Sequence, residues 1–279
     1  MKRNKLRGSM GDIVTYLVLL IASLAVLVPV LWMISTSLKS PEDTFSTPPQ
    51  WLPGHPTVDA FKRIWSDYPF GTYFANSLIV VIGATVVSLL FSTLAGFGTS
   101  RFHFRGKGTY LTFLLVTQMF PSIMLLIPMY KIMTQLGLIN TLLGLIVTYI
   151  TFTIPICSWM MLGYFDTISK ELDQAASIDG CSKFRTFWQI ILPLALPGVV
   201  ATAIYSFIVG WNEYLFAVIL MSSENMKTIP VGVGQLVSLN KIEWNDLMAA
   251  SLIATLPVSV IFIFLQKFMI NSLTAGAIK

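Results

Sequence analysis

Six long runs of apolar residues constrain the fold of this chain more than any other feature of its sequence. They lie near residues 13–36, 73–99, 109–131, 139–163, 194–220 and 249–269. A helix needs about 20 mostly apolar residues to cross the roughly 30 Å hydrocarbon core of a bilayer, and each run is long enough. Hydrophobic residues make up 55% of the chain and charged residues 11%, so little remains for a separate soluble domain. The sequence therefore predicts an all-α integral membrane protein with six transmembrane helices.

The distribution of positive charge predicts which side of the membrane each segment faces. If both termini are cytoplasmic, twelve of the eighteen lysines and arginines fall inside and six fall outside. Cytoplasmic segments carry an excess of these residues, so the net charge of +5 reflects topology rather than nucleic-acid binding. We expect a cytoplasmic tail at 1–12, a retained first transmembrane helix at 13–36 and a cytoplasmic tail at 271–279.

The stretch 169–193 lies between two apolar runs and is typical of two short helices rather than of a loop. Ser169 is placed to cap the first helix, whose first turn carries two acidic residues that the helix dipole favours. Gly180 can end that helix, because glycine takes positive φ without strain. A second helix can start at Ser182, with apolar side chains at helical spacing: Phe184, Phe187, Trp188 and Ile191. Together with the charge bias, this pattern predicts a hinged docking element at the cytoplasmic surface.

Several other functions find little support in the residues. An intramembrane enzyme needs converging nucleophiles, bases or metal ligands, but the chain has only two histidines, predicted on opposite sides of the membrane. A secondary transporter needs ionisable groups near the membrane midplane, and Glu213 is the only acidic candidate. A channel needs a repeated filter or a pore ring, and the sequence has none. Arg101 stands where a phosphate-binding loop would need its first glycine, so we do not expect this chain to hydrolyse ATP alone.

Residues 169–193 resemble the EAA loop found in membrane subunits of bacterial ABC importers. The matching residues are Ala175-Ala176, Asp179-Gly180 and the segment 190–193. Other segments resemble the carbohydrate branch of that family, the MalG-like permeases of maltose-type systems. These segments are Trp211-Asn212-Glu213, 118–121 and the tail 273–279. The resemblance runs from about residue 72 to the end, and it has one departure, because Gln174 stands where the family usually has Glu.

The resemblance implies a fold, a function and a set of partners. The fold would be the type I ABC importer transmembrane fold over residues 72–270, with a coupling loop at 166–193. The function would be that of a permease subunit that moves a sugar into a bacterial cell. The partners would be a second homologous permease, a dimer of cytoplasmic ATPases that binds ATP and Mg, an extracellular solute-binding protein and the sugar. This chain itself would need no cofactor. A permease of a non-sugar ABC importer would share the loop and stays an alternative.

The resemblance also implies which residues would act. The residues expected to dock the ATPase and couple its movement are Glu171, Asp173, Gln174, Ala175, Ala176, Asp179, Gly180, Phe184 and Trp188. Glu171 or Asp173 could supply the charge that Gln174 lacks. The outer loop between the last two apolar runs would reach the binding protein through Gly232, Gly234 and Gln235. No catalytic residue and no metal ligand is expected.

Polar residues within the apolar runs are candidates for the translocation path. Gln118 lies in a run that Pro121 and Pro128 can kink, so it either lines a cavity or packs helices together. Trp211, Asn212 and Glu213 follow in the fifth run. At about 1.5 Å per residue, Glu213 would lie roughly 28 Å along a continuous helix that starts at Leu194. There it would reach headgroup water, or it would line the path or latch the outer gate with its two neighbours.

Overall fold

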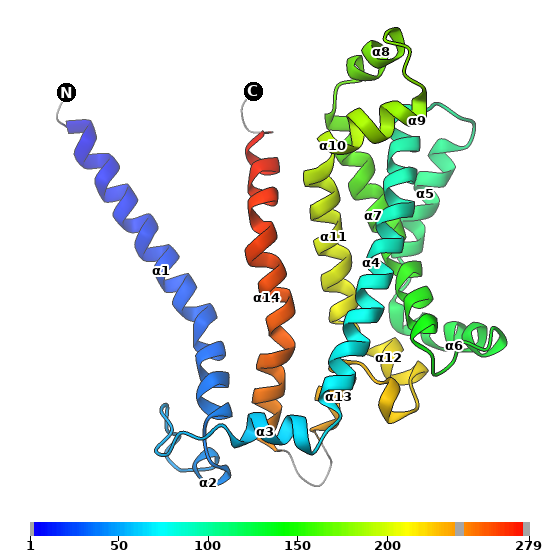
Figure 1. Ribbon diagram of the computed structural model, residues 1–279. Coiled ribbons are helices and arrows are strands. Elements are labelled where there is room, and N and C mark those ends of the chain that lie inside the picture. The colour runs from blue at the N-terminus through cyan, green and yellow to red at the C-terminus, as the bar shows by residue number, and fades with distance from the viewer. Residues whose placement is uncertain (1–2, 238–242, 276–279) are drawn as a thin grey trace. The chain divides into compact units, whose positions relative to one another are not determined.

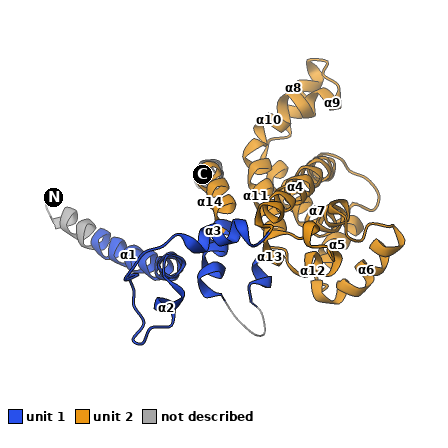
Figure 2. Ribbon diagram, turned by 60° about the horizontal axis from the view of Figure 1, so that its bottom comes forward, with its two compact units in different colours: residues 1–68, 233–254 blue, residues 69–232, 255–279 orange. Residues whose placement is uncertain are grey.

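The computed structural model describes residues 3–237 and 243–275, and every element in those ranges is a helix (Figure 1). The all-α prediction is therefore confirmed. The chain divides into two compact units, one of residues 1–68 and 233–254 and the other of residues 69–232 and 255–279 (Figure 2). The boundaries fall within α13 (Ile229–Gln235) and α14 (Trp244–Ala275), so both helices are shared between the units.

The first unit contains α1 (Arg3–Ser37), α2 (Pro41–Thr44), α3 (Asp59–Ser66) and the first turns of α14. The side chains of α1 between residues 11 and 31 are exposed although nearly all are apolar, so this surface needs lipid or another protein around it. The buried Asn245 side chain joins the helices of this unit. Its Nδ2 donates to the carbonyl oxygens of Thr36 at 3.0 Å and Lys39 at 2.8 Å, where α1 ends.

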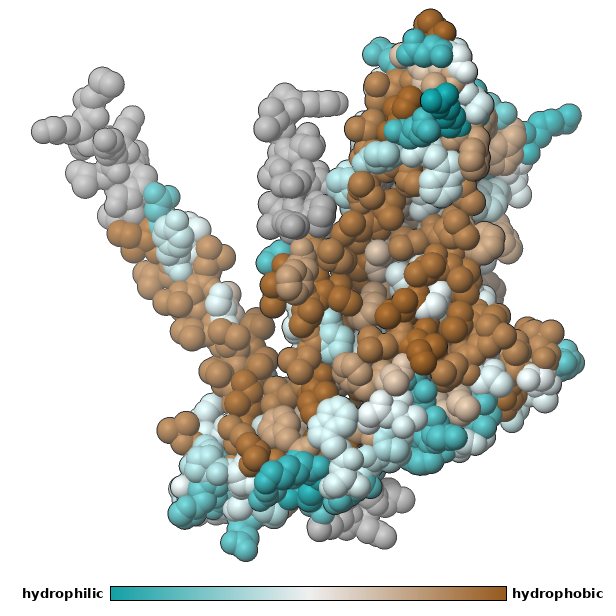
Figure 3. Space-filling view, in the orientation of Figure 1, coloured by the Kyte–Doolittle hydropathy of each residue, from teal (hydrophilic) through white to brown (hydrophobic). Residues whose placement is uncertain are grey.

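The second unit is a helical bundle. Its elements are α4 (Phe70–Arg101), α5 (Lys107–Gln118), η1 (Ser122–Leu125), α6 (Leu126–Gln135), α7 (Leu142–Thr167), α8 (Glu171–Ile178), α9 (Lys183–Thr186), η2 (Phe187–Ile191), α10 (Leu192–Leu194), α11 (Leu196–Trp211), α12 (Leu215–Leu220) and η3 (Glu224–Met226). The parts of α13 and α14 at 229–232 and 255–275 complete it. Figure 3 shows a mainly hydrophobic band on the visible face of this unit, between two more hydrophilic ends.

Small residues allow α4 and α7 to pack closely, as is common in membrane bundles. A Cβ atom on Gly96 of α4 would lie 2.6 Å from Cβ of Met161 on α7, so no larger residue fits there. Further along the same pair of helices, the buried hydroxyls of Ser88 and Thr153 are 2.6 Å apart and hydrogen-bonded. The polar and small residues of the second apolar run therefore serve helix packing in this unit.

The structure shows how the six predicted apolar runs are built. Among the described residues, four helices are long and apolar enough to cross a membrane: Gly11–Ser37, Phe70–Arg101, Leu142–Thr167 and Trp244–Gln266. Two further candidates are helix pairs, Lys107–Gln118 with Ser122–Gln135, bent by 95°, and Lys183–Leu194 with Leu196–Trp211, bent by 75°. Six spans result only if each bent pair counts as one. The third and fifth apolar runs are thus broken helices, and Pro121 adopts an extended backbone at the first break.

Candidate functional site

The two helices predicted between residues 169 and 193 are present, and the predicted turn residues shape them. The expectation that Ser169 caps the first helix is off by one residue, because Lys170 is the N-cap of α8, while Ser169 Oγ accepts the N–H of Glu171 at 3.2 Å just before it. After α8, Gly180 has φ of +78°, and the N–H of Cys181 donates to the carbonyl oxygen of Ala176 at 2.9 Å. Ser182 caps α9, because its Oγ accepts the N–H of Arg185 at 3.3 Å. The prediction of two short helices hinged at a glycine is confirmed.

The four apolar side chains predicted on one face of the second helix do not stay together. Phe187 and Ile191 are buried, with 3% and 0% of their surface exposed, in a core cluster with Phe97 and Phe165. Phe184 is 72% exposed and Trp188 is 44% exposed, and their rings lie 6.0 Å apart. The expectation of a single face is wrong: Phe187 and Ile191 point into the core, whereas Phe184 and Trp188 point away from it. Two neighbouring aromatic side chains therefore stay exposed.

The other residues predicted to couple differ in exposure. Those exposed to solvent are Glu171, Gln174, Ala175, Asp179 and Gly180. Ala176 is 3% exposed and packs inward. Asp173 points into the unit, where its Oδ2 forms an ion pair with Nε of Arg101 at 2.9 Å. Of the two acids considered as substitutes for the usual Glu at 174, Glu171 is therefore the one that α8 presents outward.

Arg101 is a residue whose role the sequence reasoning missed. It ends α4, and its side chain is 5% exposed. Besides its ion pair with Asp173, its Nη1 donates to the carbonyl oxygen of Phe165 and its Nη2 to that of Ile168, both at 3.0 Å. These carbonyls lie at the end of α7, where unpaired backbone acceptors favour a cation. The guanidinium therefore joins α4, α7 and α8.

Glu213 lies in a helix break rather than on a continuous helix. α11 ends at Trp211, and α12 starts at Leu215. The Glu213 carboxylate accepts the N–H groups of Phe216 at 2.8 Å and Ala217 at 3.1 Å, which caps α12. It also accepts the hydroxyl of Tyr149 on α7 at 2.9 Å. The expected position about 28 Å along one helix from Leu194 is wrong, because the chain bends by 75° between Leu194 and Leu196 and α11 ends at Trp211.

The neighbours of Glu213 are placed differently from one another. Trp211 is 4% exposed and stacks on Phe207 at 5.6 Å between ring centroids, so its indole is buried inside the unit rather than lining the path. Asn212 is exposed, and its Nδ2 donates to the carbonyl oxygen of Ile208 at 2.8 Å. A cavity of about 260 Å³ lies beside both Asn212 and Glu213.

That cavity lies where α5 ends and where α11 gives way to α12. Its lining includes Ser122 from the break after α5, together with Tyr149 and Phe152 from α7. Gln118 is exposed at the end of α5, and its Nε2 lies 3.5 Å from the carbonyl oxygen of Phe152. The structure thus brings Asn212 and Glu213 to one cavity and leaves Gln118 near its edge.

The predicted contact loop between the last two apolar runs is fastened to α4 where the structure describes it. A Cβ on Gly232 would lie 2.2 Å from the ring of Tyr73, so this glycine packs against its own chain rather than at a free surface. Gly234 is half-buried, whereas Gln235 is exposed. Residues 238–242 of the loop lie outside the described residues.

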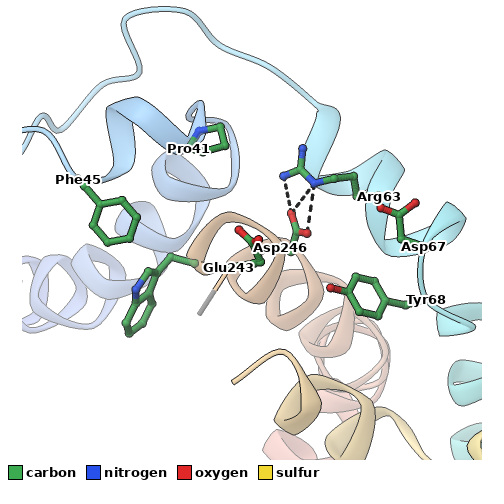
Figure 4. A pocket seen from close by; sticks show the side chains of 8 residues that line it. Pro41, Phe45, Arg63, Asp67, Tyr68, Glu243 and Asp246 are labelled. Carbon is green, nitrogen blue, oxygen red and sulfur yellow. Dashed lines mark hydrogen bonds and ion pairs between the residues drawn. The ribbon is translucent and has the colours of Figure 1, made fainter. Parts of the chain in front are cut away.

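The first unit has a cleft that the sequence did not predict. It encloses about 620 Å³ between α2, α3 and the start of α14, and aromatic and charged side chains line it (Figure 4). Arg63 donates to both carboxylate oxygens of Asp246, with Nη2 2.5 Å from Oδ1. This hydrogen bond raises the pKa of Arg63, whose guanidinium closes one side of the cleft. The described residues contain no group of three or more His, Cys, Asp or Glu that could hold a metal ion.

Comparison with known proteins identifies the family of this chain. Residues 88–274 match the model of the family described as "Binding-protein-dependent transport system inner membrane component". The chain belongs to this family. It is therefore a multi-pass membrane protein and the permease component of an ABC importer, a class in which a separate subunit hydrolyses ATP.

The alignments of this permease with its relatives span nearly the whole length of both chains. It is 37% identical to the inner membrane ABC transporter permease protein YcjP of Escherichia coli, over 91% of each chain. It is 36% identical to the trehalose/maltose transport system permease protein MalG of Thermococcus litoralis, again over 91% of each chain. It is 32% identical to the diacetylchitobiose uptake system permease protein DasC of Streptomyces coelicolor, over 100% of both chains.

A solved structure shows the same fold. The permease superposes with a TM-score of 0.79 on a chain of a bacterial ABC transporter involved in the import of the acidic polysaccharide alginate. The two chains are 24% identical, and the match covers 96% of this chain and 98% of the other. The type I ABC importer fold implied by the resemblance is thereby confirmed.

Proposed function

We propose that this permease moves a sugar into a bacterial cell and that an ATPase drives it through the α8–α9 loop. The observation that carries the proposal is the hinged helix pair, with Phe184 and Trp188 exposed beside a membrane bundle. Two exposed aromatic rings side by side are costly in water and suit burial against another protein. Glu171, Gln174, Ala175 and Asp179 would surround that contact, and Gly180 would let α8 and α9 change their mutual angle.

A sugar is favoured over other substrates by what the relatives are named for. Relatives at 36%, 33% and 32% identity carry the names of trehalose/maltose, maltodextrin and diacetylchitobiose systems. These names cover neutral saccharides of different size and linkage, so they support the substrate class rather than one sugar. Asn212, Glu213 and, at the edge of the cavity, Gln118 would offer hydrogen-bonding groups to such a substrate.

The other partners follow from the exposed surfaces and from the family. A second homologous permease would complete the path, and lipid or that permease would cover the apolar surface of α1. A solute-binding protein would deliver the sugar, with Gly234 and Gln235 near the contact. The end of the second unit that carries α8 would face the cytoplasm, as would both termini. A dimer of ATPase subunits would bind ATP and Mg there.

Purification of the complex tests this proposal. A tagged copy of the chain, extracted in detergent from its own membranes, should bring down a second permease and an ATPase. Addition of the co-encoded binding protein and single saccharides should raise ATP hydrolysis for one sugar. Stimulation by an amino acid or phosphate instead would identify a non-sugar importer. Recovery of the chain without any ATPase would contradict the proposal as a whole.

A further inference from the structure

Helix α4 is attached to a functional segment at each of its two ends. It runs through the second unit from the end that carries α8 and α9 to the end near α12 and α13 (Figure 1). At the first end, Arg101 forms an ion pair with Asp173 of α8 at 2.9 Å. The side chains of Arg101 and Asp173 are 5% and 14% exposed, so water screens this pair much less than a surface pair.

The ion pair matters because it ties the short helix α8 to the long helix α4. The helix has eight residues, and Gly180, with φ of +78°, follows it. A push on such a helix would be absorbed at the glycine unless α8 were fastened to a long element. Arg101 provides that fastening, and it also holds the carbonyl oxygens of Phe165 and Ile168 at the end of α7. A displacement of α8 therefore carries α4 and α7 with it.

The opposite end of α4 holds the segment that leads to α13. Nδ2 of Asn76 donates to the carbonyl oxygens of Asn225 and Lys227, both at 2.9 Å. The next residue, Ser77, accepts the N–H of Ile229 through its Oγ at 2.8 Å. Both side chains are buried, with 7% and 2% exposed. These bonds fix backbone groups of the 225–229 segment to the helix, so that segment also moves with α4.

We infer that α4 links the ATPase-facing loop to the outer loop as a single stiff rod, with Arg101 and Asn76 as positioning residues at its ends. The inference rests on the proposed function, since it assigns a path for the coupling that the proposed function requires. A continuous 32-residue helix resists bending, and its packing on α7 through Gly96 prevents it from sliding independently. Binding of the ATPase at one face of the membrane would then displace the outer loop at the other face through α4.

The test is a mutant cycle on the purified, reconstituted complex, with sugar moved per ATP hydrolysed as the readout. Asp173→Asn keeps the size of the side chain and removes its charge, and Asn76→Ala removes both bonds to the outer segment. Each change should lower transport per ATP by about tenfold, which is an ordinary size for an allosteric coupling. If both act through one rod, the double variant should lose no more than the worse single variant.

Controls separate this inference from general damage and from the proposed function. Arg105→Ala removes an exposed arginine near the same end of α4 and should leave transport per ATP unchanged. The inference would be contradicted if either single variant moved as much sugar per ATP as the wild type. It would also be contradicted if the losses of the two single variants multiplied in the double variant. Each variant complex is first checked for bound ATPase, so that a change in transport per ATP reports coupling rather than assembly. Absence of ligand-stimulated ATPase in the wild-type complex would instead overturn the proposed function, and the rod with it.

Discussion

The Tyr149 hydroxyl donates a hydrogen bond to Glu213 Oε2 over 2.9 Å and so joins α7 to the break between α11 and α12. The same carboxylate caps α12 through the N–H groups of Phe216 and Ala217. A single acidic residue thus fixes both the start of a helix and its position against the bundle. Tyr149, Glu213 and Phe216 all line the cavity of about 260 Å³.

Substitution of Glu213 should affect stability and uptake together. Glu213→Ala leaves two backbone donors and one hydroxyl without an acceptor, and we expect it to destabilise the complex by about 3 kcal/mol. Glu213→Gln keeps one carbonyl acceptor and should cost less than half as much. Tyr149→Phe removes one of the three bonds and serves as the matched comparison. Thermal unfolding of the purified complex and sugar uptake measure the two effects. Wild-type stability and uptake in Glu213→Ala would show that these bonds do not matter.

Gly180 should be sensitive to any residue that cannot take its backbone conformation. Proline fixes φ near −65°, far from the observed +78°, so Gly180→Pro must rearrange the turn between α8 and α9. We expect the variant to reach the membrane and to lose at least about 90% of transport. Gly163→Ala is the control, because a Cβ there meets nothing within 4 Å. Transport by Gly180→Pro at the rate of the control would mean that the hinge is not needed.

Phe184 and Trp188 should be required for assembly with the ATPase. Each exposes an aromatic surface, and burial of such a ring contributes about 2 kcal/mol to an interface. Phe184→Asp or Trp188→Asp should reduce the amount of ATPase that co-purifies by at least about tenfold. Phe104→Asp changes another exposed phenylalanine outside the two helices and should leave the yield unaltered. Equal ATPase recovery from all three variants would place the interface elsewhere.

Cysteine labelling should report the proposed orientation. Cys181 lies beside the hinge and is half-buried, whereas Cys157 is fully buried. A membrane-impermeant thiol reagent should leave Cys181 unlabelled in intact cells and label it in inverted vesicles. A cysteine introduced as Gly54→Cys, in the loop before α3, should behave in the opposite way. Labelling of Cys181 from outside the cell would reverse the proposed topology.

Single residues in the sequence predicted local structure well where their effect is limited to the neighbouring backbone. Gly180 and Ser182 shape the helices around them as expected, because capping and positive φ depend on neighbouring backbone. Ser169 was placed one residue too early, since Lys170 is the N-cap of α8. The length and apolarity of the runs likewise predicted a helical membrane protein. These features need no knowledge of how distant segments pack.

Contacts between distant segments were the part that the sequence could not predict. The ion pair of Arg101 with Asp173 joins α4 to α8, and each residue alone is an ordinary charge near a helix end. The burial of Trp211 depends partly on Phe74 of α4, a neighbour that the segment around Trp211 could not reveal. The burial of Phe187 and Ile191 against Phe97 and Phe165, with Phe184 and Trp188 left exposed, likewise depends on distant helices rather than on helical spacing.

The account's central claim is that this permease couples ATP hydrolysis by a partner to sugar uptake. Its most direct test is transport of a radiolabelled saccharide into proteoliposomes that hold the purified complex, with the binding protein outside and ATP inside. The account predicts accumulation of the sugar that depends on both ATP and the binding protein and is lost in Gly180→Pro. Accumulation without ATP, or ATP hydrolysis that moves no saccharide in the wild-type complex, would contradict it.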